Sequence, residues 1–552
     1  MSGFALTRGV TLLAVGAALA GCGADLSTLD GALDGIEERG KRAEAIEAVL
    51  AHIGEIRDVH KKEAATERAA DALIKAYDTN DGRPGVLKAV RALRKPYEEA
   101  RPLDTTNAYG KKMAPLLAKV ADDYLPGKND ELVVEACALA GELRAVDAVK
   151  SLGSLLERAA DPRIKVAVAL ALGGMKNRAA LDPLTNALLS HMPKEELEVK
   201  RVIIESLGAS GMPEAAPVLV AGLYMEDGDV SFFPYVQPAL LQLGAKNAIP
   251  ALISVLEGKN KMVDYVNEDL EPGIREFKAA WVLGDFYTKR TKAIDVLSDM
   301  LKDDKGNPSP RTSAAVPLGK IGGDRAREAL LKYVDEGHWL DRKTIIEGLY
   351  YLNDPKALPK LLEIAGPKGV TTTNGIKHHR LRWAAARGVE LVGDVAALDA
   401  FRALLDAETD EETKGVFNSY LSGFQTVEKC KADVGCWEDL LEDDSTKVVE
   451  KAAWMIAQLG DSSSVAELIA ALGKPMPMVG EGADRKPDPR GRFAILYALN
   501  RLRPKGIDIS PMAAAIAKRD GSEVPRLLAF MAVTYYNMKR HGAKGPDVKL
   551  TL

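Results

Sequence analysis

Residues 205–219 read ESLGASGMPEAAPVL, and this stretch decides the fold. An apolar segment ends at Leu207-Gly208, a short polar turn follows, and Ala215 opens a second apolar segment with Leu219 four residues later. Residues four apart share one face of a helix, so Ala215 and Leu219 point to the same side. The stretch therefore predicts two helices that are antiparallel neighbours, because the turn between them is short.

The same Ala-x-x-x-Leu step recurs along the chain. It starts at these residues, the last three being degenerate copies: Ala148, Ala180, Ala215, Ala248, Ala293, Ala326, Ala357, Ala397, Cys436 and Val465. Successive starts lie 29 to 45 residues apart, a drifting period typical of repeat proteins. A helix pair with one apolar face cannot bury that face alone, so neighbouring pairs must stack. We also expect Gly or Asn near the end of each first helix to permit a left-handed cap.

With these features the chain resembles the HEAT-repeat family over residues 130–475, and in weaker form to 542. Prolines inside the second helices, as at Pro217 and Pro250, add to the resemblance. It implies an all-α fold, a right-handed α-solenoid of antiparallel helix pairs that binds a protein partner. Armadillo and tetratricopeptide repeats are the alternatives, but the Trp, Tyr and Pro positions of tetratricopeptide units are missing.

Composition supports an extended array. The 552 residues exceed what one compact core usually holds, and 47% are hydrophobic although only 5% are aromatic. The charge is nearly balanced, with 74 basic and 79 acidic residues, so nothing global indicates nucleic-acid binding. We therefore expect no nucleic-acid partner.

The N-terminus reads MSGFALTRGVTLLAVGAALAGC and has the form of a secretory signal. Its last four residues, Leu19-Ala20-Gly21-Cys22, resemble the bacterial lipobox. The resemblance implies that residues 1–21 are removed and that Cys22 carries diacylglycerol and a further acyl chain such as palmitate. It thus implies a membrane anchor in the cell envelope, with the outer membrane facing the periplasm favoured by Gly23 after the Cys. An ordinary cleaved signal peptide is the alternative.

The chain then divides into five predicted segments. Residues 23–35 are small, polar and acidic, which indicates a flexible spacer. The helices predicted over 36–125 carry more charge and lack the repeat step. The segments are 1–21, the lipoprotein signal peptide; 22–35, the spacer; 36–125, a divergent helical N-terminal region; 126–475, the HEAT-like array; and 476–552, C-terminal helical repeats and a cap.

Two sets of side chains are candidates for binding. Phe232, Phe233 and Tyr235 lie among Gly and Pro in a predicted loop, and these residue types suit a protein interface. The alternative is that the loop folds its aromatic residues back onto the body.

The second set is basic and consists of Lys377, His378, His379, Arg380, Arg382, Trp383 and Arg387. In a helix, Arg380, Trp383 and Arg387 share one face, which would suit an acidic peptide, a phosphate-bearing glycan or a lipid. The alternative is a solvated helix face.

Two of the four cysteines lie close together, at Cys430 and Cys436. Secretion would place them in an oxidising compartment, so we predict a disulfide. Two reduced thiols are the alternative. Cys137, within an apolar run, is expected to be a small core residue.

No catalytic or metal-binding motif is present in the sequence. The seven His residues form no His-Glu-x-x-His, and the chain lacks the His-Glu dipeptides used by the HEAT proteins that are metal-dependent hydroxylases. We therefore expect no cofactor, no metal and no enzymatic activity. The predicted function is a membrane-tethered scaffold or adaptor for an unidentified envelope protein. The alternatives are an accessory protein that binds lipid, glycan or peptide and, less favoured, an enzyme with an unrecognised site.

Overall fold

The computed structural model describes most of the chain between residues 24 and 502. The described ranges are 24–38, 40–77, 83–102, 107–190, 196–227, 230–266, 270, 273–286, 291–306, 309–366, 379–474, 478–479, 486–488 and 490–502. They fall into two compact units, Met1–Leu152 and Gly153–Leu552, called here the N-terminal and C-terminal units. Within the described ranges, none of the helices combines the length and the apolar character needed to span a bilayer.

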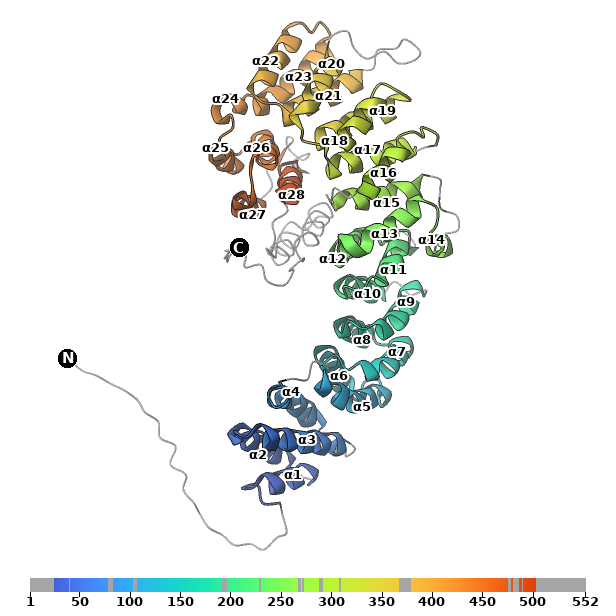
Figure 1. Cartoon of the computed structure of the whole chain (residues 1–552), viewed down its shortest axis with the longest axis vertical. Helices are drawn as coiled ribbons and strands as arrows, with labels where there is room; N and C mark the ends of the chain where they lie inside the picture. The colour runs from blue at the N-terminus through green and yellow to red at the C-terminus, as the bar shows by residue number, and fades with distance from the viewer. Residues whose placement is uncertain are drawn as a thin grey trace, which may run out of the picture. The chain divides into compact units, whose positions relative to one another are not determined.

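The N-terminal unit is a stack of three helix pairs (Figure 1). Its elements are α1 (Leu29–Glu37), α2 (Arg42–Glu55), α3 (Val59–Ala76), α4 (Arg83–Glu99), α5 (Ala108–Asp122), α6 (Asp130–Glu142) and the 3-10 turn Val146–Ala148. In this stack α1 and α2 pack on α3 and α4, which in turn pack on α5 and α6. The region predicted as divergent and helical is therefore helical and repeats a pairwise arrangement.

The predicted flexible spacer is wrong for its described residues, because Ala24 and Leu26 are hydrogen-bonded to the first two helices and α1 begins at Leu29. The Oγ1 of Thr28 caps this helix by accepting from the N–H of Gly31 at 3.1 Å. Ala32, Leu33 and Ile36 are buried at spacings of one, three and four residues. The acidic and glycine-rich composition concealed this apolar face in the sequence.

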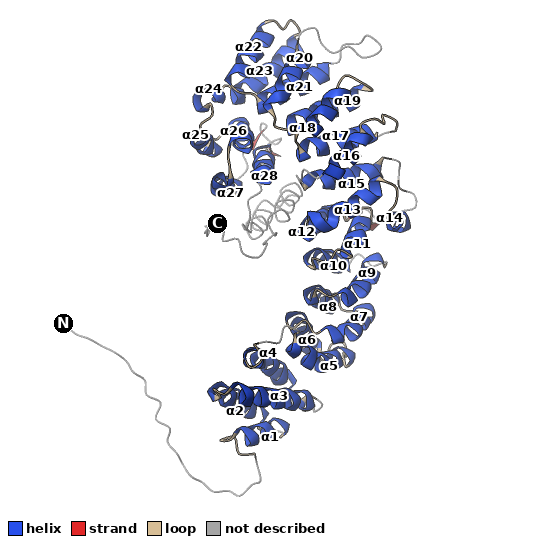
Figure 2. Cartoon of the chain, viewed as in Figure 1, coloured by secondary structure: helices blue, strands red, loops and turns tan. Residues whose placement is uncertain are grey.

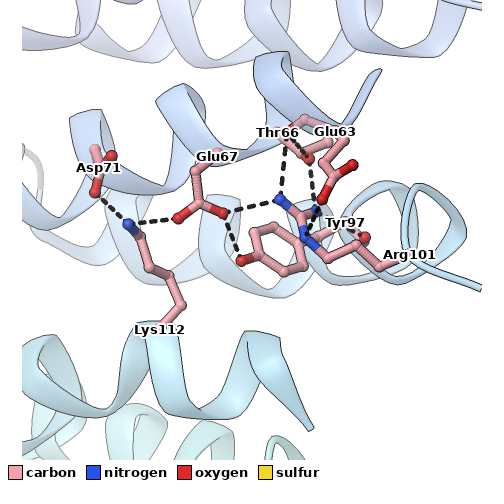
Figure 3. Close-up of polar contacts among 7 residues, drawn as sticks. All are labelled: Glu63, Thr66, Glu67, Asp71, Tyr97, Arg101 and Lys112. Carbon is pink, nitrogen blue, oxygen red and sulfur yellow. Dashed lines mark hydrogen bonds and ion pairs between the residues drawn. The ribbon is translucent and has the colours of Figure 1, made fainter. Parts of the chain in front are cut away.

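A polar network joins α3, α4 and α5 (Figure 3). Glu67 on α3 is its centre: it accepts from Tyr97 Oη at 2.6 Å and from Arg101 Nη2 at 2.8 Å, and lies 2.7 Å from Lys112 Nζ. The Arg101 guanidinium also stacks 3.7 Å from the centre of the Tyr97 ring. Burial raises the pKa of Glu67, but the hydrogen bonds from Lys112 and Tyr97 outweigh this effect and hold the pKa below its ordinary value.

The C-terminal unit is also built of helices, as Figure 2 shows. Its helices are α7 (Val149–Arg158), which contains the unit boundary, α8 (Pro162–Met175), α9 (Leu181–Leu189), α10 (Leu197–Ala209), α11 (Ala215–Gly222), α12 (Phe233–Leu243), α13 (Ala245–Leu256), α14 (Lys261–Val266), α15 (Ile274–Asp285), α16 (Thr291–Met300), α17 (Pro310–Ile321), α18 (Asp324–Tyr333), α19 (Trp339–Tyr351), α20 (Leu358–Ala365), α21 (His379–Val392), α22 (Val395–Asp406), α23 (Glu411–Phe424), α24 (Thr426–Cys430), α25 (Val434–Asp439), α26 (Thr446–Leu459), α27 (Val465–Leu472) and α28 (Arg490–Leu502).

Short elements interrupt the helices at a few places. They are the antiparallel strand pairs β1 (Glu226–Asp227) with β2 (Val230–Ser231) and β3 (Met478–Val479) with β4 (Lys486–Pro487), and the 3-10 turns Arg178–Ala180, Pro355–Ala357, Leu440–Glu442 and Ser462–Ser464. The predicted C-terminal repeats and cap are described only as far as Leu502 at the end of α28. The remainder of the predicted C-terminal segment, from residue 503 onward, lies outside the described residues.

Helices of the C-terminal unit form two layers. In the first layer, each helix packs on the next helix of the layer or is hydrogen-bonded to it. This layer consists of α8, α10, α12, α15, α17, α19 and α21. The second layer consists of α9, α11, α13, α16, α18, α20 and α22. This arrangement confirms the predicted all-α solenoid of stacked helix pairs.

The Ala-x-x-x-Leu step forms the core of each pair. Both residues of the step are at most 1% exposed at seven successive starts, from Ala148 with Leu152 to Ala357 with Leu361. Each deeply buried Leu side chain contributes about 1.5–3 kcal/mol through removal of apolar surface from water. The repeated step is therefore what holds the two layers together.

Gly244 of Leu243-Gly244 ends α12 at a positive φ of 91°, in line with the expected cap, whereas the glycines of Leu207-Gly208 and Leu283-Gly284 lie inside their helices and have a different role. Gly208 lies within α10, where a Cβ would stand 2.8 Å from the Cα of Ala239 on α12. Gly284 on α15 faces Pro317 of α17 in the same way, at 2.6 Å from its Cα. These glycines let neighbouring helices of the first layer touch along their backbones, because a side chain at either position would collide with the next helix.

The chain turns back on itself after α23. Helix α26 packs against α21 and α23, and α28 packs on α26. As a result, Tyr497 Oη on α28 donates to the carbonyl of Tyr351 on α19 at 3.0 Å, although 146 residues separate the two. The Trp454 and Tyr497 rings stack with centroids 4.2 Å apart, so α26 and α28 cover the end of α19 with aromatic side chains.

Candidate functional site

The first predicted aromatic set does not form a surface patch. Phe232 is fully buried just before α12, with Lys200 Nζ 5.5 Å from its ring centre. Phe233 and Tyr235 are half-buried in the first turns of the helix. The insertion read as a loop is the β1–β2 hairpin, whose second strand leads directly into α12 and turns Phe232 into the core. Phe232 is therefore corrected from a binding residue to a core residue.

The second predicted set is dispersed within α21. Lys377 and His378 lie outside the described residues, and His379 begins the helix with its Nδ1 3.0 Å from Thr413 Oγ1. Trp383 Nε1 donates to the same hydroxyl at 3.1 Å. Arg380 is exposed, and its guanidinium lies 5.7 Å from the ring centre of Trp339.

The remaining cations of that set are neutralised by carboxylates. Arg382 is buried and pairs with Glu408, while its Nε donates to the carbonyl of Ala365 at 3.1 Å. Arg387 pairs with both Glu390 and Glu450. The described part of the set is thus a structural ion-pair network, and it offers no continuous basic face to an anionic ligand.

A buried charge cluster connects α21 with α26. Lys451 is fully buried, and its Nζ donates to the carbonyls of Glu390, Leu391 and Gly393 at 2.7, 3.1 and 2.7 Å. These carbonyls end α21, where a cation is favoured by the helix dipole. Burial lowers the pKa of Lys451 to about 7, and burial raises the pKa of Glu390 to about 7 against the opposing effect of Arg387. The cluster fixes the turned-back helices onto the array.

A second buried ion pair crosses three helices of the first layer. Lys320 Nζ on α17 lies 2.8 Å from Asp285 Oδ1 on α15, and Gln237 on α12 donates to the other carboxylate oxygen. Lys320 also lies 4.0 Å from the ring centre of Trp281. Burial raises the pKa of Asp285, an effect that Lys320 and Gln237 oppose. The ammonium group of this ion pair thus packs against the Trp281 ring.

Beside this rigid support lies an exposed aromatic surface. Phe277 is 37% exposed, and its ring centroid is 5.9 Å from that of half-buried Trp281, one helical turn further along α15. We call Phe277 and Trp281 the aromatic patch. Tyr265 on the preceding α14 is 72% exposed. Exposed aromatic residues that are fixed from behind are the usual centre of a protein interface.

The start of α15 is itself anchored. Arg275 pairs with Asp264 on α14, and the Oη of Tyr224 donates to the Arg275 carbonyl at 2.7 Å. Lys278 Nζ donates to the Leu223 carbonyl at 3.1 Å. The aromatic patch is therefore presented by a helix that is held at its start as well as along its buried face.

The aromatic patch was missed at the sequence level. The apolar core of α15 consists of Ala279, Ala280, Val282 and Leu283, so the apolar residues left over on this helix are Ile274, Phe277 and Trp281. Setting aside the core positions of each helix in the sequence would have left Phe277 and Trp281 as apolar residues outside the core. Loop composition alone directed attention to Phe232 instead.

The cysteines occupy three kinds of position. In the structure the Sγ atoms of Cys430 and Cys436 are bonded, with their Cα atoms 5.3 Å apart, and neighbouring Trp437 is fully buried. Cys137 is a buried thiol, and burial raises its pKa to about 12. Cys22 lies outside the described residues. Among the described residues, no group of three or more His, Cys, Asp or Glu side chains is placed to hold a metal ion.

Comparison with known proteins identifies the repeats. Residues 149–231 match the family model described as HEAT repeats. Over 143 residues the chain is 28% identical to the phycocyanobilin lyase subunit alpha of Picosynechococcus sp., a match that covers 24% of this chain and 53% of the relative. The chain thus spans about half the length of this curated relative.

Solved structures of similar fold are more distant. Kap121p is 12% identical with a TM-score of 0.36, covering 89% of this chain and 54% of that chain. Human deoxyhypusine hydroxylase in complex with glycerol is 17% identical with a TM-score of 0.22, covering 58% and 98%. At these identities the similarity concerns the fold alone.

The prediction that the chain is not an enzyme is corrected by these findings. Its matched curated relative is a subunit of a lyase, and that relative is found through sequence similarity rather than through a catalytic motif. A search for known motifs covers only known kinds of site, so their absence does not exclude an activity. What the comparisons and the structure support together is that the chain contains HEAT repeats within an all-α solenoid.

Proposed function

We propose that this chain is a membrane-tethered HEAT-repeat protein that acts as a scaffold or adaptor for another protein in the bacterial cell envelope. HEAT-type solenoids offer long surfaces for protein partners because each repeat adds one more strip of helix surface. The observation that carries the proposal is the aromatic patch, where exposed Phe277 and half-buried Trp281 stand on α15, which the Asp285–Lys320 ion pair joins to α17.

The proposed partner surface has the features of an interaction hot spot. Trp and Tyr are enriched at such positions, and an anchored ring loses little conformational entropy when a partner covers it. We therefore place the partner across α14 and α15, where Tyr265 and Phe277 are exposed.

The proposed tether rests on the sequence. Leu19-Ala20-Gly21-Cys22 has the composition, order and position of a lipobox, and two or three acyl chains at Cys22 make a lasting anchor. The disulfide of Cys430 and Cys436 suits an oxidising compartment. Gly23 favours the periplasmic face of the outer membrane where the host has two membranes.

Crosslinking in intact cells tests this proposal. The wild-type chain and Cys22→Ser are expressed at equal levels, crosslinked and recovered, and the membrane and soluble fractions are compared. We expect a specific envelope protein on the membrane-bound wild type and loss of membrane attachment for Cys22→Ser. If the wild type and Cys22→Ser distribute equally between the membrane and soluble fractions, the proposed tether is wrong. If no partner protein is recovered with the wild type, the proposed scaffold function is wrong.

A second candidate function is participation in a lyase reaction, favoured by the similarity to the phycocyanobilin lyase subunit alpha. Its test is direct addition of phycocyanobilin to the purified chain, followed by gel filtration and visible absorption spectroscopy. Pigment that elutes with the protein supports this candidate. Complete separation of pigment and protein argues against it.

A further inference from the structure

The folded body begins very close to the proposed acylated cysteine. Ala24 is only two residues after Cys22, and the backbone of two residues spans about 7 Å at most. From Ala24 onward the chain is held by α1 and α2. The distance between the lipid and the first helices is therefore set by these two residues.

Three contacts hold residues 24–28 in place. The N–H of Ala24 donates to Glu38 Oε1 at 2.9 Å, and Lys41 Nζ donates to the Ala24 carbonyl at 3.4 Å. The His52 ring Nε2 lies 3.1 Å from the Leu26 carbonyl. Glu38 ends α1, whereas Lys41 begins and His52 almost ends α2, so the segment is attached to both helices.

Packing leaves little freedom for this segment to move away. A Cβ added at Gly35 would lie 2.9 Å from the Leu26 side chain and 3.4 Å from that of Ala24. One added at Gly31 would collide with the Asp25 carbonyl. The close approach of residues 24–26 to α1 thus depends on glycines in α1.

We infer that the end of the N-terminal unit formed by residues 24–28, Glu38 and Lys41 is the face that lies against the lipid headgroups. We call it the anchor face. This inference rests on the proposed acylation of Cys22. It goes beyond tethering because it assigns one orientation to the N-terminal unit, with the α1–α2 pair at the membrane and the α5–α6 pair furthest from it.

Electrostatic attraction does not produce this contact. Residues 24–56 contain eight acidic residues and three basic ones, so this end of the unit is repelled by anionic lipids. The covalent anchor and the short connection impose the proximity instead. A lengthened connection would therefore release the anchor face from the membrane even though the protein stayed attached.

Fluorescence quenching on vesicles tests the orientation. The full acylated chain is labelled at Ala43→Cys, an exposed position in the first turn of α2, or at Leu125→Cys, which is 54% exposed between α5 and α6. Cys137 does not compete for the label, because it is only 1% exposed. Each protein is bound to phosphatidylcholine vesicles that carry a nitroxide on a fraction of the headgroups.

We expect several-fold stronger quenching at Ala43→Cys than at Leu125→Cys. Insertion of a Gly-Ser linker of about ten residues after Gly23 adds about 17 Å of root-mean-square reach and should bring the two positions closer together in quenching. If the chain floats with the vesicles but both positions are quenched equally, the proposed orientation is wrong and the proposed acylation is not affected. A chain that does not float, and behaves like Cys22→Ser, overturns the acylation and with it the orientation.

Discussion

At the scale of single residues, glycine decides how closely the helices of the first layer approach. Gly319 on α17 faces the backbone of Gly348 on α19, as Gly208 on α10 faces that of Ala239 on α12. Leu-Gly pairs whose glycine lies inside a helix therefore mark contacts between repeats. The pattern was visible in the sequence, but its role was not, because a close approach depends on a helix about 30 residues away.

Gly208→Ala should destabilise the C-terminal unit by about 1–3 kcal/mol, because its methyl group would collide with Ala239. The matched control is Gly415→Ala on α23, where a Cβ meets no atom within 4 Å; it should stabilise by about 0.5–1 kcal/mol through helix propensity. Urea unfolding followed by tryptophan fluorescence measures both, because all five Trp residues lie in this unit. A stabilising Gly208→Ala would contradict the close-contact role.

Lys451 shows what sequence patterns cannot reveal. On an amphipathic helix a lysine is ordinarily solvated, yet this one is fully buried under the carbonyls that end α21. Its burial depends on the turn of the chain after α23, which brings together residues about 60 positions apart. The Asp285–Lys320 ion pair was also not predicted, because its residues lie on different helices, α15 and α17, and the sequence does not show that they meet.

Lys451→Met should destabilise the C-terminal unit by about 3–5 kcal/mol, because it leaves three buried carbonyls without the ammonium group that donates to them. Lys429→Met, at an exposed position on α24, should change stability by less than about 0.5 kcal/mol. Urea unfolding measures the free energy of unfolding of each variant, and the two values are compared with that of the wild type. Similar values for the two variants would show that Lys451 is replaceable by an apolar side chain.

At the scale of helices, the N-terminal unit depends on polar contacts as well as on its apolar core. Glu67 joins three helices through Tyr97, Arg101 and Lys112. Helices were predicted over residues 36–125, and α2 to α5 lie within that range. This network was not predicted, because the sequence does not show which charged side chains of different helices meet.

Glu67→Gln should weaken the N-terminal unit in a pH-dependent manner. The pKa of Glu67 is lowered in the folded chain, so the stabilisation is complete above the ordinary value of 4.5 and is lost as pH falls below it. Hydrogen exchange of the α3 amides should therefore differ between variant and wild type at about pH 6, and the difference should shrink as the pH falls below 4.5. Glu98→Gln, in an exposed pair with Arg94, is the control and should have little effect. A difference that persists in acid would exclude a role for the Glu67 charge.

The α24–α25 turn is closed by a disulfide that the sequence spacing predicted and the structure contains. Replacement of both Cys430 and Cys436 by Ser should cost about 2 kcal/mol, the loop-closure entropy of so short a loop. Mass spectrometry of the native protein with and without reductant checks the bond, and urea unfolding checks its energetic effect. Two free thiols in protein taken from the envelope would contradict it.

At the scale of the whole molecule, sequence repetition predicted the fold class and the layers. A Leu such as Leu207 near the end of one helix and an Ala such as Ala215 at the start of the next form a pattern that recurs along the chain. This pattern follows from local helix periodicity, so a single sequence is enough to find it. The turn after α23 and the burial of Phe232 required knowledge of which distant segments meet. The aromatic patch became visible only after the core positions of α15 were known.

The most direct test of the central claim compares two equally exposed apolar residues. Phe277 in the aromatic patch and Leu459 at the end of α26 are each 37% exposed. Phe277→Ala and Leu459→Ala are expressed in cells, crosslinked, and the recovered partner protein is quantified. The proposed scaffold predicts a loss of at least about fivefold for Phe277→Ala, as expected of an interface hot spot, and wild-type recovery for Leu459→Ala. Undiminished recovery with Phe277→Ala would contradict binding through the aromatic patch.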